Sequence, residues 1–144
     1  MNVRKIILEE FNRQQTLPHV WGTNDCLCYA AAIAQRIIGR DPIAHLRGRY
    51  DSEIGAKRVM IEEGWETLGD VAASIFSEIP VAQAQPGDWV YAQNPDDTET
   101  IGVAVGERFV AKGQIGNEQG PLLYARRAFR VGGSINDSIV MAAA

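Results

Sequence analysis

Residues 21–39 read WGTNDCLCYAAAIAQRIIG, and this stretch decides the expected fold. From Cys26 to Ile38 the residues are nearly all apolar and rich in alanine, which predicts a buried central helix. Any of the polar residues 23–25 can cap its start, because each side chain accepts a hydrogen bond from a free N–H group of the first turn. Gly39 stands where a glycine commonly ends a helix.

Four further helices are predicted around this one. Apolar residues at helical spacing predict a first helix that ends near Thr16, before Leu17-Pro18 breaks it. Asp41-Pro42 resembles an N-cap followed by a first-turn proline and predicts a short helix through about Arg47. Two more are expected, at Ser52–Glu63 and, capped by Thr67, through Phe76.

The pattern changes after Pro80, where strands are predicted. They are expected at Trp89–Ala92, at Thr100–Val105 and Arg108–Lys112 as a hairpin, and at Leu122–Val131. Helices that precede strands, without βαβ alternation, indicate the α+β class. We expect one domain over residues 1–131, followed by a flexible or partner-docking tail over residues 132–144.

The composition narrows the possible partners. The chain has 144 residues and a formal net charge of −4, which argues against non-specific binding to nucleic acid. Arg126, Arg127 and Arg130 could form a local basic patch, although a solvated strand edge is the favoured interpretation. No signal peptide and no apolar run long enough to span a membrane are visible, and the two cysteines suggest synthesis in a reducing cytoplasm.

Cys26 is the candidate nucleophile. The helix macrodipole favours an anion at a helix N-terminus, so a thiol there is expected to have its thiolate stabilised. The alternative is an inert, buried cysteine that packs beside Ala30. Cys28 lies on another face of the same helix, where core packing is its expected role.

A cysteine nucleophile needs a base, and the chain has two histidines. His19 is a candidate base that could fold back towards Cys26, whereas a surface or half-buried role is expected for His45. The cysteines and histidines match no zinc spacing, and no strand–glycine-rich turn–helix pattern is present, so we expect no metal and no cofactor. Asp88 is expected to cap a turn. Core positions are expected for the tryptophans, Trp21, Trp65 and Trp89.

Three short motifs carry a family resemblance. Trp21-Gly22-Thr23-Asn24-Asp25-Cys26 resembles the opening of the nucleophile helix in the NlpC/P60 cysteine peptidases, a papain-like group. Pro86-Gly87-Asp88-Trp89-Val90 is similar to the Pro-Gly-Asp-Leu-Val strand of that family, and residues 101–106 to its Val-Gly-Ile strand. The resemblance implies a papain-like fold with a cysteine at the start of a central helix packed on a small antiparallel sheet.

The chain is also similar to a group of small bacteriophage proteins of this fold that are found with tail genes. The shared features are the Trp-Gly-x-x-Asp-Cys opening, Gly39-Arg40-Asp41-Pro42, a segment from Tyr50 to Gly55-Ala56, the Gly-Asp strand and a basic-aromatic ending at residues 128–131. This likeness implies a location in the virion tail, after synthesis in the bacterial cytoplasm, with other tail or tail-tip proteins as partners.

The resemblance places Cys26 on the nucleophile of the family. Thr100 stands where the family has its catalytic histidine, and Ala111 stands near its third polar residue. The resemblance therefore implies that the chain is a tail or tail-tip structural or assembly component with a degenerate catalytic site. The alternative is an active cysteine peptidase or amidase that cleaves cell-wall peptidoglycan peptides during phage entry, with His19 or His45 as an unusual base.

Overall fold

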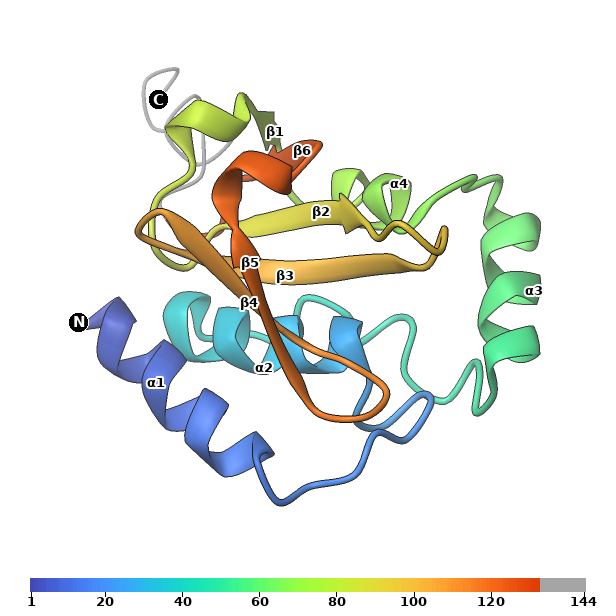
Figure 1. Cartoon of the computed structure of the whole chain (residues 1–144). Coiled ribbons are helices and arrows are strands. Elements are labelled where there is room, and N and C mark those ends of the chain that lie inside the picture. Colours follow the sequence, from blue (N-terminus) through green and yellow to red (C-terminus); the bar gives the residue numbers. More distant parts are fainter. Residues whose placement is uncertain (133–144) are drawn as a thin grey trace.

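Four helices and a six-stranded antiparallel sheet make up the computed structural model, which describes residues 1–132 (Figure 1). The predicted α+β class is confirmed. Apart from Gly132, the predicted tail lies outside the described residues. The helices are α1 (Val3–Gln14), α2 (Cys26–Ile38), α3 (Glu53–Glu63) and α4 (Leu68–Ala73). The strands are β1 (Glu78–Ile79), β2 (Trp89–Gln93), β3 (Glu99–Val105), β4 (Arg108–Lys112), β5 (Asn117–Pro121) and β6 (Arg127–Phe129).

The helix ends follow the predicted capping chemistry. Of the three polar residues before Cys26, Asp25 is the N-cap of α2, and Gly39 ends that helix with a φ of 79°. Ser52 caps α3, and Thr67 forms a capping box with Asp70 at the start of α4. Local side chain to backbone hydrogen bonds therefore fix where three of the helices begin.

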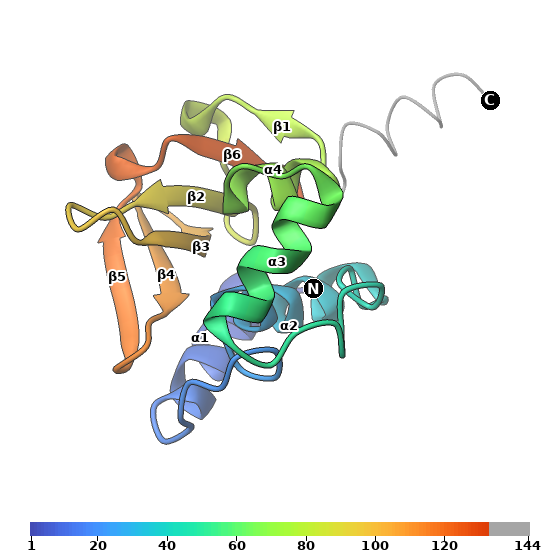
Figure 2. The same ribbon diagram turned by 90° about the vertical axis from the view of Figure 1, so that its right-hand side faces the viewer.

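The sheet has the strand order β1-β6-β2-β3-β4-β5. Figures 1 and 2 show α1 and α2 together on one side of it, with α3 standing at the end of α2 where Cys26 lies. One face of the sheet packs on α1, α2 and α4, and the opposite face carries a second, smaller apolar cluster that includes Val90, Ala104 and Phe109. The hairpin of β4 and β5 extends past α2 towards α1 (Figure 1).

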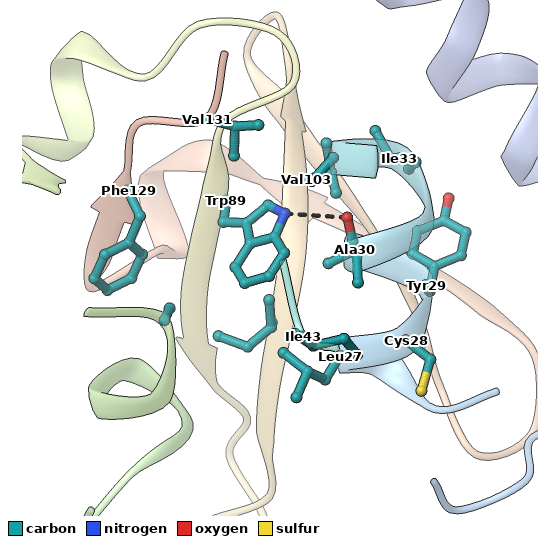
Figure 3. Close-up of a cluster of buried hydrophobic side chains, with 14 of the residues drawn as sticks. Leu27, Cys28, Tyr29, Ala30, Ile33, Ile43, Trp89, Val103, Phe129 and Val131 are labelled. Atoms are coloured by element: carbon teal, nitrogen blue, oxygen red, sulfur yellow. Dashed lines mark hydrogen bonds between the residues drawn. The ribbon is translucent and has the colours of Figure 1, made fainter. Parts of the chain in front are cut away.

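Trp89 is the anchor of the main core, as predicted. It is fully buried, and its indole N–H donates to the Ala30 carbonyl of α2 at 3.1 Å (Figure 3). Its ring meets Phe76 edge-on at 4.9 Å. This hydrogen bond joins the second strand to the middle of the central helix, 59 residues earlier in the chain. The core thereby fixes the position of α2, and of Cys26 at its start, relative to the sheet.

The predicted helix at Asp41–Arg47 is wrong, because the segment is a series of turns. The Asp41 carboxylate accepts a hydrogen bond from the Ile43 N–H and is also paired with Arg47 at 2.6 Å, which favours a local turn over a helical ladder. Ile43 and Leu46 are buried in the main core, and this burial holds the turns in place.

The predicted strand at Leu122–Val131 is only partly right. A 3-10 turn at Leu122–Tyr124 comes first, and only Arg127–Phe129 pairs with β1 and β2. Pro121 has no N–H group to donate, the Leu122 N–H makes one last bond, to the Glu107 carbonyl, and the chain then enters the 3-10 turn. β5 was not predicted, because its residues NEQGP have little strand propensity and are held by pairing with β4.

The predicted solvated basic edge holds for Arg126, which is exposed, but is wrong for Arg127 and Arg130. Arg127 forms ion pairs with Asp70 and Glu78, and Arg130 pairs with the buried carboxylate of Asp88 at 3.1 Å. Asp88 caps its turn as predicted, because it accepts a hydrogen bond from the Gln85 N–H. These arginines neutralise local acids, so they do not form a free cationic surface.

Replacing Trp89 by phenylalanine tests the link between sheet and helix. We expect Trp89→Phe to lower the free energy of unfolding by about 2 kcal/mol, because it leaves the Ala30 carbonyl without its donor and opens a small void. Urea unfolding measures the change. Tyr124→Phe, at an exposed ring, is the matched control and should change the value by less than about 0.5 kcal/mol. Equal effects of the two changes would contradict the role given to Trp89.

Candidate functional site

The Asp25 carboxylate organises the region around Cys26. One oxygen accepts the Cys28 N–H at 2.9 Å and thereby caps α2. The other accepts the Gly22 N–H at 3.0 Å and the Tyr50 hydroxyl at 2.6 Å. With Asp25 only 2 % exposed, one side chain joins the loop before Cys26, the start of α2 and the segment before α3.

Gly22 is required by the same arrangement. Its φ of +84° lies in the left-handed region, and a Cβ atom there would stand 2.2 Å from the Tyr50 carbonyl oxygen. The Trp-Gly-x-x-Asp-Cys motif and the later tyrosine are therefore parts of one packed unit. The sequence motif thus has a structural explanation that does not need catalysis.

Cys26 is the first residue of α2 and lines a cavity, but its environment disfavours the thiolate. Burial of the sulfur and the neighbouring Asp25 carboxylate raise the pKa of Cys26 to about 12, and the N–H groups of Ile101 and Leu27 oppose this shift only in part. The expected stabilisation of the thiolate is therefore outweighed, since desolvation penalises the charged form. Cys28 packs in the core as predicted, and burial raises its pKa to about 11.

The cavity beside Cys26 has a volume of about 370 Å³, which suits a side chain or a short segment of a ligand. One wall consists of the loop before α2, another of α3 and the start of α4, and a third of the β2–β3 and β4–β5 connections. Its lining is mixed in character. The apolar side chains include Trp21, Met60, Trp65, Leu68 and Ile115, and the carboxylates are Asp25, Asp96, Glu99 and Glu118.

The structure brings His19, but not His45, into this cavity. The His19 ring is half-buried and meets Trp21 edge-on at 4.8 Å, and the hydrogen bonds of residues 1–132 include none between His19 and Cys26. His45 is exposed and lies near Asp41, away from the cavity lining. Thr100, at the position that the resemblance assigns to the catalytic histidine, lines the cavity, and a threonine hydroxyl is no general base at neutral pH.

Two of the tryptophans are not the core anchors that the sequence suggested. Trp21 and Trp65 are half-buried and line the cavity, although Trp65 also packs against the main core. A tryptophan in a motif does not reveal whether its ring faces a core or a cavity, because both environments favour a large apolar ring. No signal in the sequence alone could have separated these cases.

Lys112 is a site residue that the sequence analysis placed only as the end of a strand. It is 3 % exposed, and its ammonium donates to the carbonyls of Gln14 at 3.1 Å and Leu17 at 2.5 Å. Burial lowers its pKa. Because these carbonyls end α1 and begin the loop that carries His19, Lys112 holds that loop against β4.

Glu99 joins two other walls of the cavity. Its Oε1 accepts the Tyr91 hydroxyl at 2.6 Å and the Leu68 N–H at 3.3 Å, so it links β3 to the start of α4. Burial and Glu99 together raise the pKa of Tyr91 to about 12. No role was predicted for Glu99 from the sequence. Its role depends on a residue 31 positions away.

Residues 1–132 were searched for a metal site and for a membrane-spanning helix. No group of three or more His, Cys, Asp or Glu side chains in this part of the chain is arranged to hold a metal ion. No helix there is both long and apolar enough to cross a bilayer.

Alkylation of the thiol tests the electrostatics of Cys26. In a Cys28→Ser background, we expect iodoacetamide at pH 7.5 to modify Cys26 at least ~100-fold more slowly than free cysteine, because a pKa near 12 leaves almost no thiolate. Mass spectrometry follows the reaction, and unfolding in urea should abolish the protection. A fast reaction of the folded protein would contradict the raised pKa.

Replacing Lys112 tests the attachment of the loop. Lys112→Met removes the donor to two carbonyls, and we expect the free energy of unfolding to fall by about 1–3 kcal/mol. Hydrogen exchange at residues 20–24 should become faster. Lys57→Met, at an exposed lysine on α3, is the control and should change neither quantity. Similar exchange rates in the two variants would show that Lys112 does not hold the loop.

Comparison with known proteins assigns the chain to one family. A family model described as a domain of unknown function, DUF6950, matches residues 2–131, which include every helix and strand described above. None of the curated proteins matches the chain. The chain therefore belongs to the DUF6950 family.

Proposed function

We propose that the chain is a bacteriophage tail or tail-tip structural or assembly component, with an NlpC/P60-like, papain-like fold that has lost hydrolytic activity. The ordered motif resemblance supports the fold and the tail context. The location of the protein in the virion and its tail-protein partners are parts of the same proposal.

The environment of Cys26 is the observation that supports the proposed loss of activity. A cysteine hydrolase needs a thiolate and a base that accepts its proton. Here the thiol has a pKa of about 12, and no hydrogen bond joins it to either histidine, both of which lie in the described part of the chain. The cavity that remains can hold a ligand without cleaving it.

A second candidate is an active cysteine peptidase or amidase that acts on peptidoglycan peptides. One observation favours it, since His19 lines the same cavity as Cys26. A movement of the loop that carries His19 could bring the imidazole to the thiol. The hydrogen bond from Lys112 to the Leu17 carbonyl opposes such a movement.

Digestion of purified cell walls separates these two functions. We expect the wild-type protein to release no peptide fragments from peptidoglycan of the host at neutral pH, measured by mass spectrometry. A release that is lost in Cys26→Ala and His19→Ala, but kept in His45→Ala, would establish the peptidase instead.

The tail assignment has its own test. Purified particles of the phage that encodes the chain should contain the protein, and a Cys26→Ala phage should retain its titre. Absence of the protein from intact particles would contradict the proposal. A loss of titre with unchanged particle composition would indicate that Cys26 has a chemical role.

A further inference from the structure

The cavity beside Cys26 has an unbalanced charge. Four carboxylates line it, from Asp25, Asp96, Glu99 and Glu118, against one ammonium, from Lys112. Lys112 donates two of its three N–H groups to backbone carbonyls and is only 3 % exposed, so it offers a ligand little access to its charge. The cavity therefore favours a ligand that carries positive charge.

Not all of these carboxylates can meet a ligand. Asp25 is buried, and both its oxygens already accept hydrogen bonds. Glu99 and Asp96 use one oxygen each, Glu99 for Tyr91 and Leu68, and Asp96 for Thr98. Their second oxygens have no bonded partner among residues 1–132, and both residues lie on the same side of the cavity, in and before β3.

Apolar groups form the rest of the cavity. Trp21 and Trp65 are half-buried within it, and Met60 of α3 also lines it. Aromatic faces attract cations as well as aliphatic groups. A ligand that inserts an aliphatic chain and keeps a cation near Glu99 would satisfy both parts of the lining.

Ile115 indicates that the ligand is a chain segment and not a small molecule. It lies at the tip of the β4–β5 hairpin, lines the cavity and is fully exposed. A small molecule inside the cavity would leave such a side chain in water. An extended segment that continues across the rim would cover it, as apolar side chains at protein interfaces are covered.

We infer that this cavity binds an extended peptide segment of a partner protein, which places an aliphatic side chain between Trp21 and Trp65 and a neighbouring lysine or arginine against Glu99 and Asp96. The inference rests on the proposed loss of hydrolysis, because the bound segment must stay intact. It gives the scaffold a use that needs neither a thiolate nor a catalytic imidazole.

Two blocked pentapeptides, Gly-Leu-Lys-Leu-Gly and Gly-Leu-Glu-Leu-Gly, test the inference on the full chain by NMR titration. We expect the lysine peptide to shift the indole N–H signals of Trp21 and Trp65, while the signal of the fully buried Trp89 stays unchanged. The glutamate peptide should bind at least ~10-fold more weakly. Equal binding of the two peptides, tighter binding of the acidic one, or no shift with either would overturn the inference.

Isosteric variants test whether the carboxylates of Glu99 and Asp96 contact the lysine of the peptide. Glu99→Gln and Asp96→Asn keep the oxygens that accept the internal hydrogen bonds, and each should weaken the lysine peptide about two- to fivefold. Glu107→Gln, at an exposed carboxylate outside the cavity, is the matched control and should bind like the wild type. If the control weakened binding of the lysine peptide equally, the effect would come from the net charge of the protein, and the assigned contact would be overturned.

The same samples separate the two proposals. Mass spectrometry of the peptide after the titration reports whether it has been cleaved. An intact peptide with no tryptophan shifts contradicts the binding inference alone. If the wild-type protein cleaves the peptide and the Cys26→Ala variant leaves it intact, the proposed loss of hydrolysis is contradicted, whatever the tryptophan shifts show.

Discussion

The hydrogen bonds of the buried Asp25 carboxylate are the constraint on which the rest of the site depends. They tie a loop, a helix start and a distant tyrosine to one side chain. Such a buried carboxylate is tolerable only when its lone pairs are satisfied, so all three donors must stay in place together. The left-handed Gly22 and the packing of Tyr50 against the loop follow from that requirement.

The same constraint sets the chemistry of Cys26. Placing a carboxylate next to a thiol in a desolvated position disfavours the thiolate, and burial also raises the pKa of Tyr50, which is bound to Asp25. The contacts that hold this helix start in place therefore also disfavour the thiolate of its cysteine. A rigid, half-apolar cavity with acidic groups at its edge is better suited to holding a ligand than to attacking one.

The tertiary core transmits this arrangement to the sheet. Trp89 binds the middle of α2, and Lys112 and Glu99 hold the other walls of the cavity through contacts with α1 and α4. These three residues come from three successive strands, β2, β3 and β4. The cavity is thus built by the sheet side chains that face the helices, and its shape depends on the strand register as much as on the loops.

The sequence by itself determined the α+β class, the capped central helix with Cys26 at its start, the hairpin of β3 and β4, and the burial of Cys28 and Trp89, because these depend on local propensity, capping and periodicity. Only the tertiary structure decided which polar residue caps α2, that residues 41–47 form turns and that NEQGP pairs as β5. It also decided that Trp21 and Trp65 face a cavity, that Lys112 is buried, and that the pKa of Cys26 rises instead of falling. Local contacts of Asp41 contribute to the turns, but the other outcomes depend on partners distant in the chain, since burial and long-range hydrogen bonds outweigh local preference.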